Sequence, residues 1–335
     1  MSATRRKTQR EQNPFPYTDS NKRYYTYDHY LKTTYGGKCA KVTLDAGFTC
    51  PNIDGRCALG GCIYCSGRGS GDFAPSAAIP LSEQYRIQTE RIRKKWRTER
   101  FIPYLQAHTN TYASVERLSA VYEEVLSLKG AVAMHIATRA DCLDDGVLSL
   151  LSELAERIPL TVELGLQSVH DETAHRINRG HTYADFLDGY RRLRCASGKI
   201  RIGVHLINGL PGEGRREMLE SVARVAALAP DEIKLHLLHV LRGTRLGELY
   251  ESGEYTPLLR EEYVKTVAEQ LTLIPQKTVI GRLTGDGDAT SLLAPLWSLK
   301  KVTVLNDIDK YLFENDLFQG KFVDNAQKII QNISV

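Results

Sequence analysis

Three cysteines in one loop hold the most specific chemical signal of this sequence. Cys50 stands in a Thr-Cys-Pro-Asn segment, and Cys62 and Cys65 follow in a Gly-Gly-Cys-Ile-Tyr-Cys segment. Three closely spaced thiolates with no histidine between them can bind three irons of a [4Fe-4S] cluster and leave the fourth iron open. The spacing therefore predicts a reactive centre, because an open iron can accept a further ligand.

A fourth cysteine in the same loop leaves several ligand sets possible. Cys57, Cys62 and Cys65 form the tighter set, whereas Cys50, Cys62 and Cys65 use the Thr-Cys-Pro opening. If all four bound, the site would be a closed four-thiolate centre, either zinc or a fully ligated electron-transfer cluster. Cys57 and Cys39 thus remain open as additional ligands.

The elements around this loop alternate in a regular way from residue 41 onward. Short runs rich in β-branched and aromatic residues alternate with longer runs of helical period, which is typical of strand-helix units around a parallel sheet. Strands are predicted at residues 41–45, 101–106, 132–137, 160–165, 201–207 and 232–240. Helices are predicted at residues 82–96, 114–128, 145–156, 184–196 and 214–228.

This alternation predicts an α/β fold, a partial (β/α)6 barrel with its ligands at the carboxyl ends of the strands. Residues 1–38 are polar and tyrosine-rich and read as an N-terminal extension. The barrel core is assigned to residues 39–245. Residues 246–335 are expected to form a small α+β region that completes the barrel and covers the substrate site. In it we predict a helix at 260–273, a strand at 278–283 and two shorter helices.

Composition narrows the class of protein. The seven cysteines include five between residues 39 and 65, which is not the distribution of a secreted disulfide framework. No apolar run approaches the roughly eighteen residues that a membrane span needs. We therefore expect a protein of the reducing cytoplasm, with no membrane partner.

Two segments are locally basic although the net charge is only +4. Both are candidate contacts for a nucleic-acid backbone, and both are equally consistent with a solvated surface. They comprise Arg5, Arg6, Lys7, Arg10, Lys22 and Arg23 in the tail, and Arg86, Arg91, Arg93, Lys94, Lys95, Arg97 and Arg100 near Trp96.

The cysteine loop resembles that of the radical S-adenosylmethionine (SAM) enzymes, in the branch related to the catalytic subunit of Elongator. The resemblance extends along the chain through Thr-Arg-Ala-Asp at 138–141, Glu-Leu-Gly-Leu-Gln-Ser at 163–168, Asn-Arg-Gly-His at 178–181 and Gly-Leu-Pro-Gly at 209–212. It implies that Cys50, Cys62 and Cys65 are the cluster ligands. The same resemblance implies SAM as the second cofactor, with a 5′-deoxyadenosyl radical as the reactive species.

The resemblance also implies roles for residues at the strand ends. Gln106 and Asn110 are expected near the amino group of SAM, and Glu163 and Gln167 near its ribose. A further candidate is Tyr64, which would shield the cluster or pack on adenine. Arg139 could bind the carboxylate of SAM or that of the substrate, and Arg282 could bind a substrate carboxylate.

The substrate implied by the resemblance is transfer RNA, bound through its anticodon loop. The expected reaction converts a carboxymethylaminomethyl group on carbon 5 of the wobble uridine to aminomethyl, with flavodoxin or ferredoxin as the electron donor. The basic helix around Trp96, the tyrosine-rich tail, and Lys300 and Lys301 are the expected RNA contacts. Two alternatives stay open: a radical SAM enzyme acting on a small metabolite, and a zinc-containing RNA-binding protein without catalysis.

Overall fold

A curled sheet of seven parallel strands forms the centre of the computed structural model, which describes residues 13–324 except 70, 72, 73 and 286. The strand order is β1-β2-β3-β4-β5-β6-β8, so the first six strands stand in the sheet in their order along the chain. The strands are β1 (Ala40–Leu44), β2 (Phe101–Leu105), β3 (Met134–Thr138), β4 (Leu160–Gln167), β5 (Ile200–Asn208), β6 (Glu232–Leu237) and β8 (Val279–Arg282). The expected partial barrel is confirmed, with β8 as a seventh strand beside β6.

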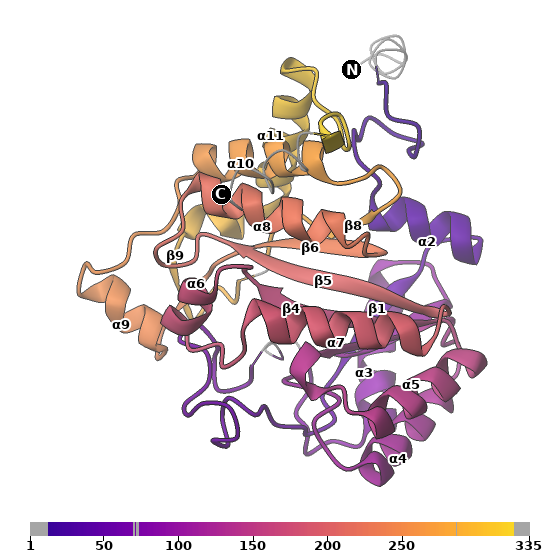
Figure 1. Ribbon diagram of the computed structural model, residues 1–335. Helices are drawn as coiled ribbons and strands as arrows, with labels where there is room; N and C mark the ends of the chain where they lie inside the picture. Colours follow the sequence, from indigo (N-terminus) through magenta and orange to yellow (C-terminus); the bar gives the residue numbers. More distant parts are fainter. Residues whose placement is uncertain (1–12, 70, 72–73, 286, 325–335) are drawn as a thin grey trace.

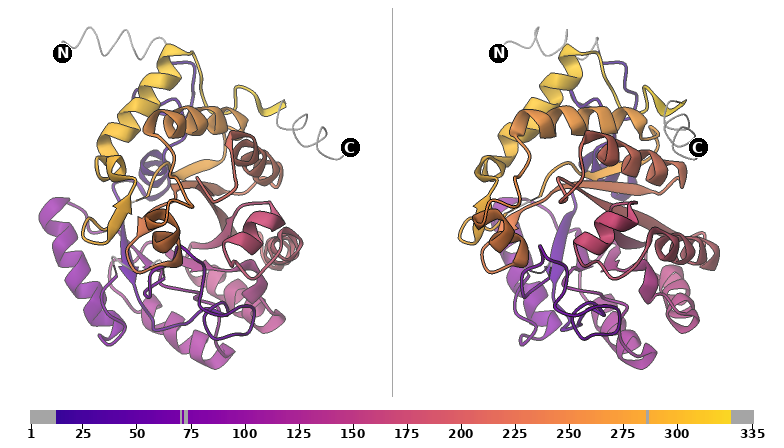
Figure 2. Two further views of the ribbon diagram at one scale, coloured as in Figure 1. Left: turned by 90° about the vertical axis from the view of Figure 1, so that its left-hand side faces the viewer. Right: turned by 60° about the vertical axis from the view of Figure 1, so that its left-hand side comes forward.

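Helices cover the outer face of this half-barrel (Figure 2). They are α3 (Leu81–Lys95), α4 (Val115–Leu126), α5 (Asp145–Arg157), α7 (Tyr183–Ala196), α8 (Arg215–Ala227) and α10 (Arg260–Leu273). Each packs an apolar stripe against the strands, and together they build one large core that includes Leu118, Leu151, Phe186, Val222 and Val267. The hydrophobic effect thus closes the outside of the sheet and leaves its inner face free for polar side chains.

The N-terminal extension covers the amino-terminal end of the barrel. Helix α2 (Tyr27–Tyr35) begins at Thr26, whose hydroxyl accepts a hydrogen bond from the His29 amide, and ends at Gly36 in the left-handed conformation. In Figure 1 this helix lies at one end of the sheet, and the cysteine loop lies toward the other. Sequence periodicity did not indicate α2, because most of its residues are polar.

This placement corrects the expected role of the tyrosine-rich tail. Tyr24 is buried, and Tyr27 and Tyr30 pack against a small apolar cluster at the amino ends of β2 and β3. These rings therefore stabilise the fold instead of offering stacking surfaces for RNA. The basic residues Arg5, Arg6, Lys7 and Arg10 lie outside the described residues.

The C-terminal part contributes further elements besides β8, the seventh strand of the sheet. Strands β7 (Val240–Leu241) and β9 (Leu292–Ala294) form an antiparallel pair, followed by a short 3-10 helix, Leu296–Leu299, and α11 (Lys301–Glu314). The two helices expected here are present, although α11 is as long as α10. Two further helices, α6 (Asp171–Arg176) and α9 (Arg245–Glu251), were not predicted. Within the described residues no helix is long and apolar enough to span a bilayer.

Candidate active site

A cavity of about 750 Å³ opens at the carboxyl ends of the strands, beneath the cysteine loop. Figure 2 shows the loop lying across this end of the half-barrel. The lining combines the cysteine loop, the inner faces of the strands, and the segment that precedes α11. This is the edge at which ligands bind in other parallel α/β folds.

The three expected ligands share this cavity, and Cys57 does not. Cys50, Cys62 and Cys65 all contribute to the lining. The Cys57 thiol instead points to Asp141, with its sulfur 3.7 Å from Oδ2, and the residue is exposed to solvent. The chain thus brings together the set with the Thr-Cys-Pro opening and turns the fourth cysteine away.

Cys62 is the most deeply embedded of the three. Its sulfur accepts hydrogen bonds from Asn52 Nδ2 at 3.5 Å and from an Arg179 Nη at 3.9 Å. A hydrogen bond from the Cys65 thiol and the charge of Arg179 lower the pKa of Cys62 well below its usual value, against the effect of burial. The lowered pKa favours the thiolate, which is the form that binds iron.

A set of contacts ties the cysteine loop to the segment after α6. Asn178 Nδ2 donates to the carbonyl oxygens of Leu59 and Gly61 at 2.9 and 2.7 Å, and the Asn52 amide donates to the Asn178 carbonyl. Gly180 has φ of +72°, and a Cβ at this position would collide with the Asn52 side chain. We call these residues, Asn52, Asn178, Arg179 and Gly180, the loop latch.

The donor set of the cavity consists of thiols, which suits an iron-sulfur cluster. Within the described part of the chain, no group of three or more His, Cys, Asp or Glu side chains is arranged to hold a single metal ion. A [4Fe-4S] cube places a different requirement on the protein, because each thiolate meets a different iron. Three thiols line one cavity, and the lowered pKa of Cys62 favours the form of the sulfur that binds iron.

The residues expected near SAM fall into two groups. Gln106, Gln167 and Tyr64 line the cavity. Gln167 also has φ of +78°, at an irregularity in the β4-β5 pairing, and such unfavourable backbone is often found at functional sites. Asn110 is fully buried, and its Nδ2 donates to the carbonyls of Leu105, Ala107 and Ala137. Asn110 therefore shapes the turn after β2.

Arg139 lines the cavity but is already engaged. Its Nε and Nη2 donate to the two oxygens of Asp141 at 2.9 and 2.7 Å, and its Nη1 donates to the Arg179 carbonyl at 2.8 Å. Burial opposes its charge, but Asp141 raises the pKa of Arg139 above the ordinary value. The guanidinium thus supports the loop latch, and a carboxylate ligand would have to compete with Asp141.

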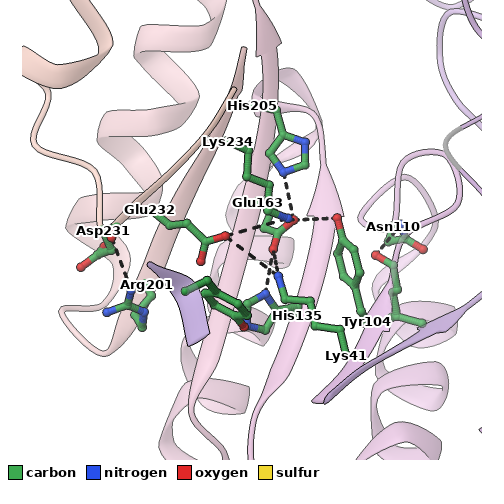
Figure 3. Close-up of polar contacts among 12 residues, drawn as sticks. Lys41, Tyr104, Asn110, His135, Glu163, Arg201, His205, Asp231, Glu232 and Lys234 are labelled. Carbon is green, nitrogen blue, oxygen red and sulfur yellow. Dashed lines mark hydrogen bonds and ion pairs between the residues drawn. The ribbon is translucent and has the colours of Figure 1, made fainter. Parts of the chain in front are cut away.

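Glu163 is the centre of a buried polar cluster on the inner face of the sheet (Figure 3). Its carboxylate accepts from Lys41 at 2.8 Å, Tyr104 at 2.6 Å, His135 at 2.8 Å and His205 at 2.9 Å, and from Lys234. Five donors already surround the two oxygens, so a ribose hydroxyl would have to displace one of them. We call these six residues the Glu163 cluster.

Electrostatics keeps one negative charge at the centre of this cluster. Burial would raise the pKa of Glu163, but Lys234 and Lys41 outweigh it and hold the pKa well below the usual value. Burial lowers the pKa of His135 to about 3 and that of His205 to about 4, so both rings are neutral. Burial also raises the pKa of the nearby Glu232, which favours its protonated form.

The Glu163 cluster and the loop latch were largely absent from the sequence-based predictions. A signal for the cluster was present in the strands, because Glu232, Lys234 and His236 alternate with apolar residues in β6. Polar residues at every second position indicate a strand with one polar face. In a curled sheet that face is the inside of the barrel.

The basic helix α3 is poorly placed for an anticodon loop. Arg86 pairs with Glu83 and Glu90, and Arg93 pairs with Glu99. Trp96 follows the helix, and Lys38, just before β1, packs on its ring at 4.3 Å. This end of α3 therefore lies at the amino-terminal edge of the sheet, away from the cavity. Lys301, by contrast, lines the cavity, and Lys300 is its exposed neighbour.

Sequence comparison identifies two regions of the chain. Residues 52–225 match the family described as the radical SAM superfamily, and residues 230–314 match the Radical_SAM C-terminal domain. The chain is 44% identical to the protein YtqA of Bacillus subtilis, across 95% of this chain and 98% of that protein. It is also 29% identical to the tRNA uridine(34) acetyltransferase of Methanocaldococcus jannaschii, across 48% of this chain and 30% of that enzyme.

A solved structure with a similar fold is the archaeal Elp3 of Methanocaldococcus infernus with an N-terminal deletion. The TM-score is 0.62 at 21% sequence identity, and the match covers 84% of this chain and 64% of that structure. The two proteins therefore share the arrangement of their half-barrels.

Proposed function

Because this chain belongs to the radical SAM superfamily of enzymes, in its Elongator-like branch, we propose that it binds a [4Fe-4S] cluster through Cys50, Cys62 and Cys65 and cleaves SAM. The observation that carries this proposal is the convergence of these three thiols on one cavity, with Cys57 directed to Asp141 instead. When bound, the cluster and SAM supply a 5′-deoxyadenosyl radical that abstracts hydrogen from an unactivated carbon.

The residues of the chain serve this chemistry by placement and by exclusion of water. Arg179 and Asn52 donate hydrogen bonds to the Cys62 sulfur, and the latch keeps the loop over the cavity. Gln106 and Gln167 present amide groups at the strand ends, where the amino group and the ribose of SAM are proposed to bind. Tyr64 lies between two ligands and is partly buried, a position that shields the cluster from solvent.

We further propose that the substrate is tRNA with a carboxymethylaminomethyl group on the wobble uridine, and that the product carries aminomethyl. Support comes from the similarity to an enzyme named for tRNA uridine 34 and from the positively charged cavity. A flavodoxin or ferredoxin is the proposed electron donor. A radical SAM enzyme of a small metabolite is the alternative, and it predicts no salt-sensitive affinity for tRNA.

The ligand set is tested by single alanine variants of the four loop cysteines, reconstituted with iron and sulfide without oxygen. Cys50→Ala, Cys62→Ala and Cys65→Ala are expected to lose most of their iron and all reductive cleavage of SAM. Cys57→Ala is the matched control and should retain both. Cleavage retained by Cys50→Ala would show that the tighter cysteine spacing binds the cluster, and a colourless zinc-loaded wild type would favour the RNA-binding alternative.

The substrate is tested by nucleoside mass spectrometry of tRNA from cells with and without the gene. We expect the carboxymethylaminomethyl nucleoside to accumulate when the gene is deleted, and the aminomethyl nucleoside and its products to disappear. Unchanged wobble-uridine side chains would contradict the substrate and leave the proposed SAM chemistry intact.

A further inference from the structure

We propose that Lys234, Arg282 and His236 form a carboxylate-binding subsite inside the barrel, which holds the carboxylate of the substrate's carboxymethyl group. The proposal rests on the proposed function, since it names the part of that substrate which the cavity binds. It adds Lys234 and His236, which had no expected role, and it assigns Arg282 to the same subsite, while His205 keeps its single N–H on Glu163.

The first argument is the register of three adjacent strands. His205 on β5 is paired with Lys234 on β6, and Lys234 is paired with Arg282 on β8. Paired residues on neighbouring strands share a face and lie about 5 Å apart, and all three side chains line the cavity. The chain thus sets three nitrogen-bearing side chains in one row across the inner face.

The second argument is His236, which lies next to this row on the carboxyl side. His236 follows Lys234 by two residues and therefore shares its face. Its ring lies 5.0 Å from that of His205, between centroids. The Nε2 of His236 is buried and has no hydrogen-bond partner among the described residues. A buried ring nitrogen without a partner is costly, and a bound ligand would satisfy it.

The third argument is the charge of the cavity. Its lining carries six cationic side chains and one carboxylate, Glu163; the cations are Lys41, Arg139, Arg179, Lys234, Arg282 and Lys301. Asp141 pairs with Arg139. Glu163 contacts both Lys41 and Lys234, and Glu232 lies 4.0 and 3.9 Å from the same two ammonium groups. Cationic side chains thus predominate in the lining of the cavity, and such a lining favours an anionic ligand.

The position of Arg139 supports the same conclusion. Its guanidinium donates to Asp141 through two nitrogens and to the Arg179 carbonyl through the third. Lys234 is bonded to Glu163, but its ammonium group has three N–H donors and can bind a second carboxylate. SAM carries a carboxylate as well, and the same side chains have the chemistry to bind that group. The test below separates these two sources.

The test measures binding without turnover. Cluster-loaded enzyme with SAM but no reductant is titrated with tRNA that carries carboxymethylaminomethyl-uridine or aminomethyl-uridine at the wobble position. A charge-assisted pair supports a preference of roughly tenfold for the carboxylate-bearing tRNA in the wild type. Lys234→Met and Arg282→Met should each weaken binding of that tRNA alone, whereas Lys234→Arg should keep the preference.

Lys199→Met is the matched control, because this lysine is exposed and pairs with Glu156 on the surface. It should leave the preference unchanged. Thermal melting identifies any variant that is unfolded. If one of Lys234→Met and Arg282→Met is unfolded, the binding preference of the other one tests the subsite. A wild type without preference, or a preference that survives in the folded methionine variants, would overturn the subsite.

Two further readouts separate the related hypotheses. SAM binding without tRNA is measured in the wild type, in Lys199→Met and in Lys234→Met. Loss of SAM binding in Lys234→Met alone would assign the carboxylate to SAM and overturn the proposal. Conversion of the tRNA by the wild type in the complete assay tests the proposed function. Preference without conversion would keep the subsite and reject that function.

Discussion

Glu163 illustrates how one buried residue can organise an entire cavity. Its side chain is fully buried and accepts hydrogen bonds from five strands, β1 to β6 with the exception of its own. A buried carboxylate is unfavourable without partners, but here two ammonium groups and three neutral donors surround it. The same contacts fix the positions of Lys41 and Lys234, so the cluster is as much a scaffold for the cavity as a source of stability.

Replacing Glu163 with Gln should destabilise the fold strongly. The amide keeps the size of the side chain but removes the carboxylate that contacts the buried Lys234 and the half-buried Lys41, and breaking a buried pair in this way costs about 3–5 kcal/mol. The measurement is the free energy of unfolding in urea. The control is Glu156→Gln on the surface, whose pair with Lys199 is exposed and should contribute at most about 1 kcal/mol. Equal losses in the two variants would contradict a central role for Glu163.

The two histidines of the Glu163 cluster make stability depend on pH. Their folded pKa values of about 3 for His135 and about 4 for His205 lie below the unfolded value of 6.5. The unfolded chain therefore binds more protons between these limits, so this stability is complete above pH 6.5 and is lost as the pH falls toward 4.

Thermal melting between about pH 7.5 and about pH 5 tests this dependence. We expect the melting temperature to fall as the pH is lowered, and the fall to be smaller in His135→Gln. His175→Gln, on the exposed side of α6, is the control and should follow the wild type. An identical fall in His135→Gln would exclude a contribution from this ring.

At the scale of elements, the loop latch decides where the cysteines lie. The loop has little regular structure, and its position depends on contacts with residues more than a hundred positions away in sequence. Gly180 is required there for two reasons: its φ is positive, and a side chain would displace Asn52.

Gly180→Ala should therefore release the loop without unfolding the barrel. We expect the iron content after reconstitution to fall by at least half and SAM cleavage to fall with it, while the far-ultraviolet circular dichroism stays unchanged. Gly198→Ala is the matched control, because its φ is not in the left-handed region and no atom lies within 4 Å of the added Cβ. Wild-type iron content in Gly180→Ala would contradict the latch.

The regular elements followed their local patterns closely. The observed strands and helices of the barrel begin and end within a few residues of the predicted bounds. Each has apolar residues at the period of its secondary structure and end residues that favour its termini. The short helices α2, α6 and α9 were missed, because tertiary contacts and capping stabilise them more than an apolar stripe does.

At the scale of the whole molecule, the two ends of the barrel have different tasks. Helix α2 and its tyrosines close the amino-terminal end, and the cavity opens at the carboxyl end under the cysteine loop. A large substrate must therefore approach from the carboxyl side. The basic residues after α3 lie at the wrong edge for this approach, whereas Lys300 and Lys301 lie beside the opening.

The double variant Lys300→Gln, Lys301→Gln should weaken tRNA binding and reduce its salt dependence. Loss of two phosphate contacts lowers the slope of log affinity against log salt by roughly 1.4 for a single strand. The control is Lys94→Gln, Lys95→Gln at the end of α3, with the same change of charge. A larger effect in the control would place the RNA on the opposite edge of the sheet.

The sequence alone determined the barrel and the class of chemistry, because strand and helix periods are local and a motif of three cysteines in one loop is contiguous. Gln106, Gln167, Arg139 and Arg282, which were named from the sequence as site residues, all line the cavity. Tertiary structure decided the rest. Only the folded chain directs Cys57 to Asp141, engages Arg139, and brings Glu163 together with Lys41 and Lys234. These outcomes depend on which distant side chains meet in a buried space, and local sequence patterns do not encode that.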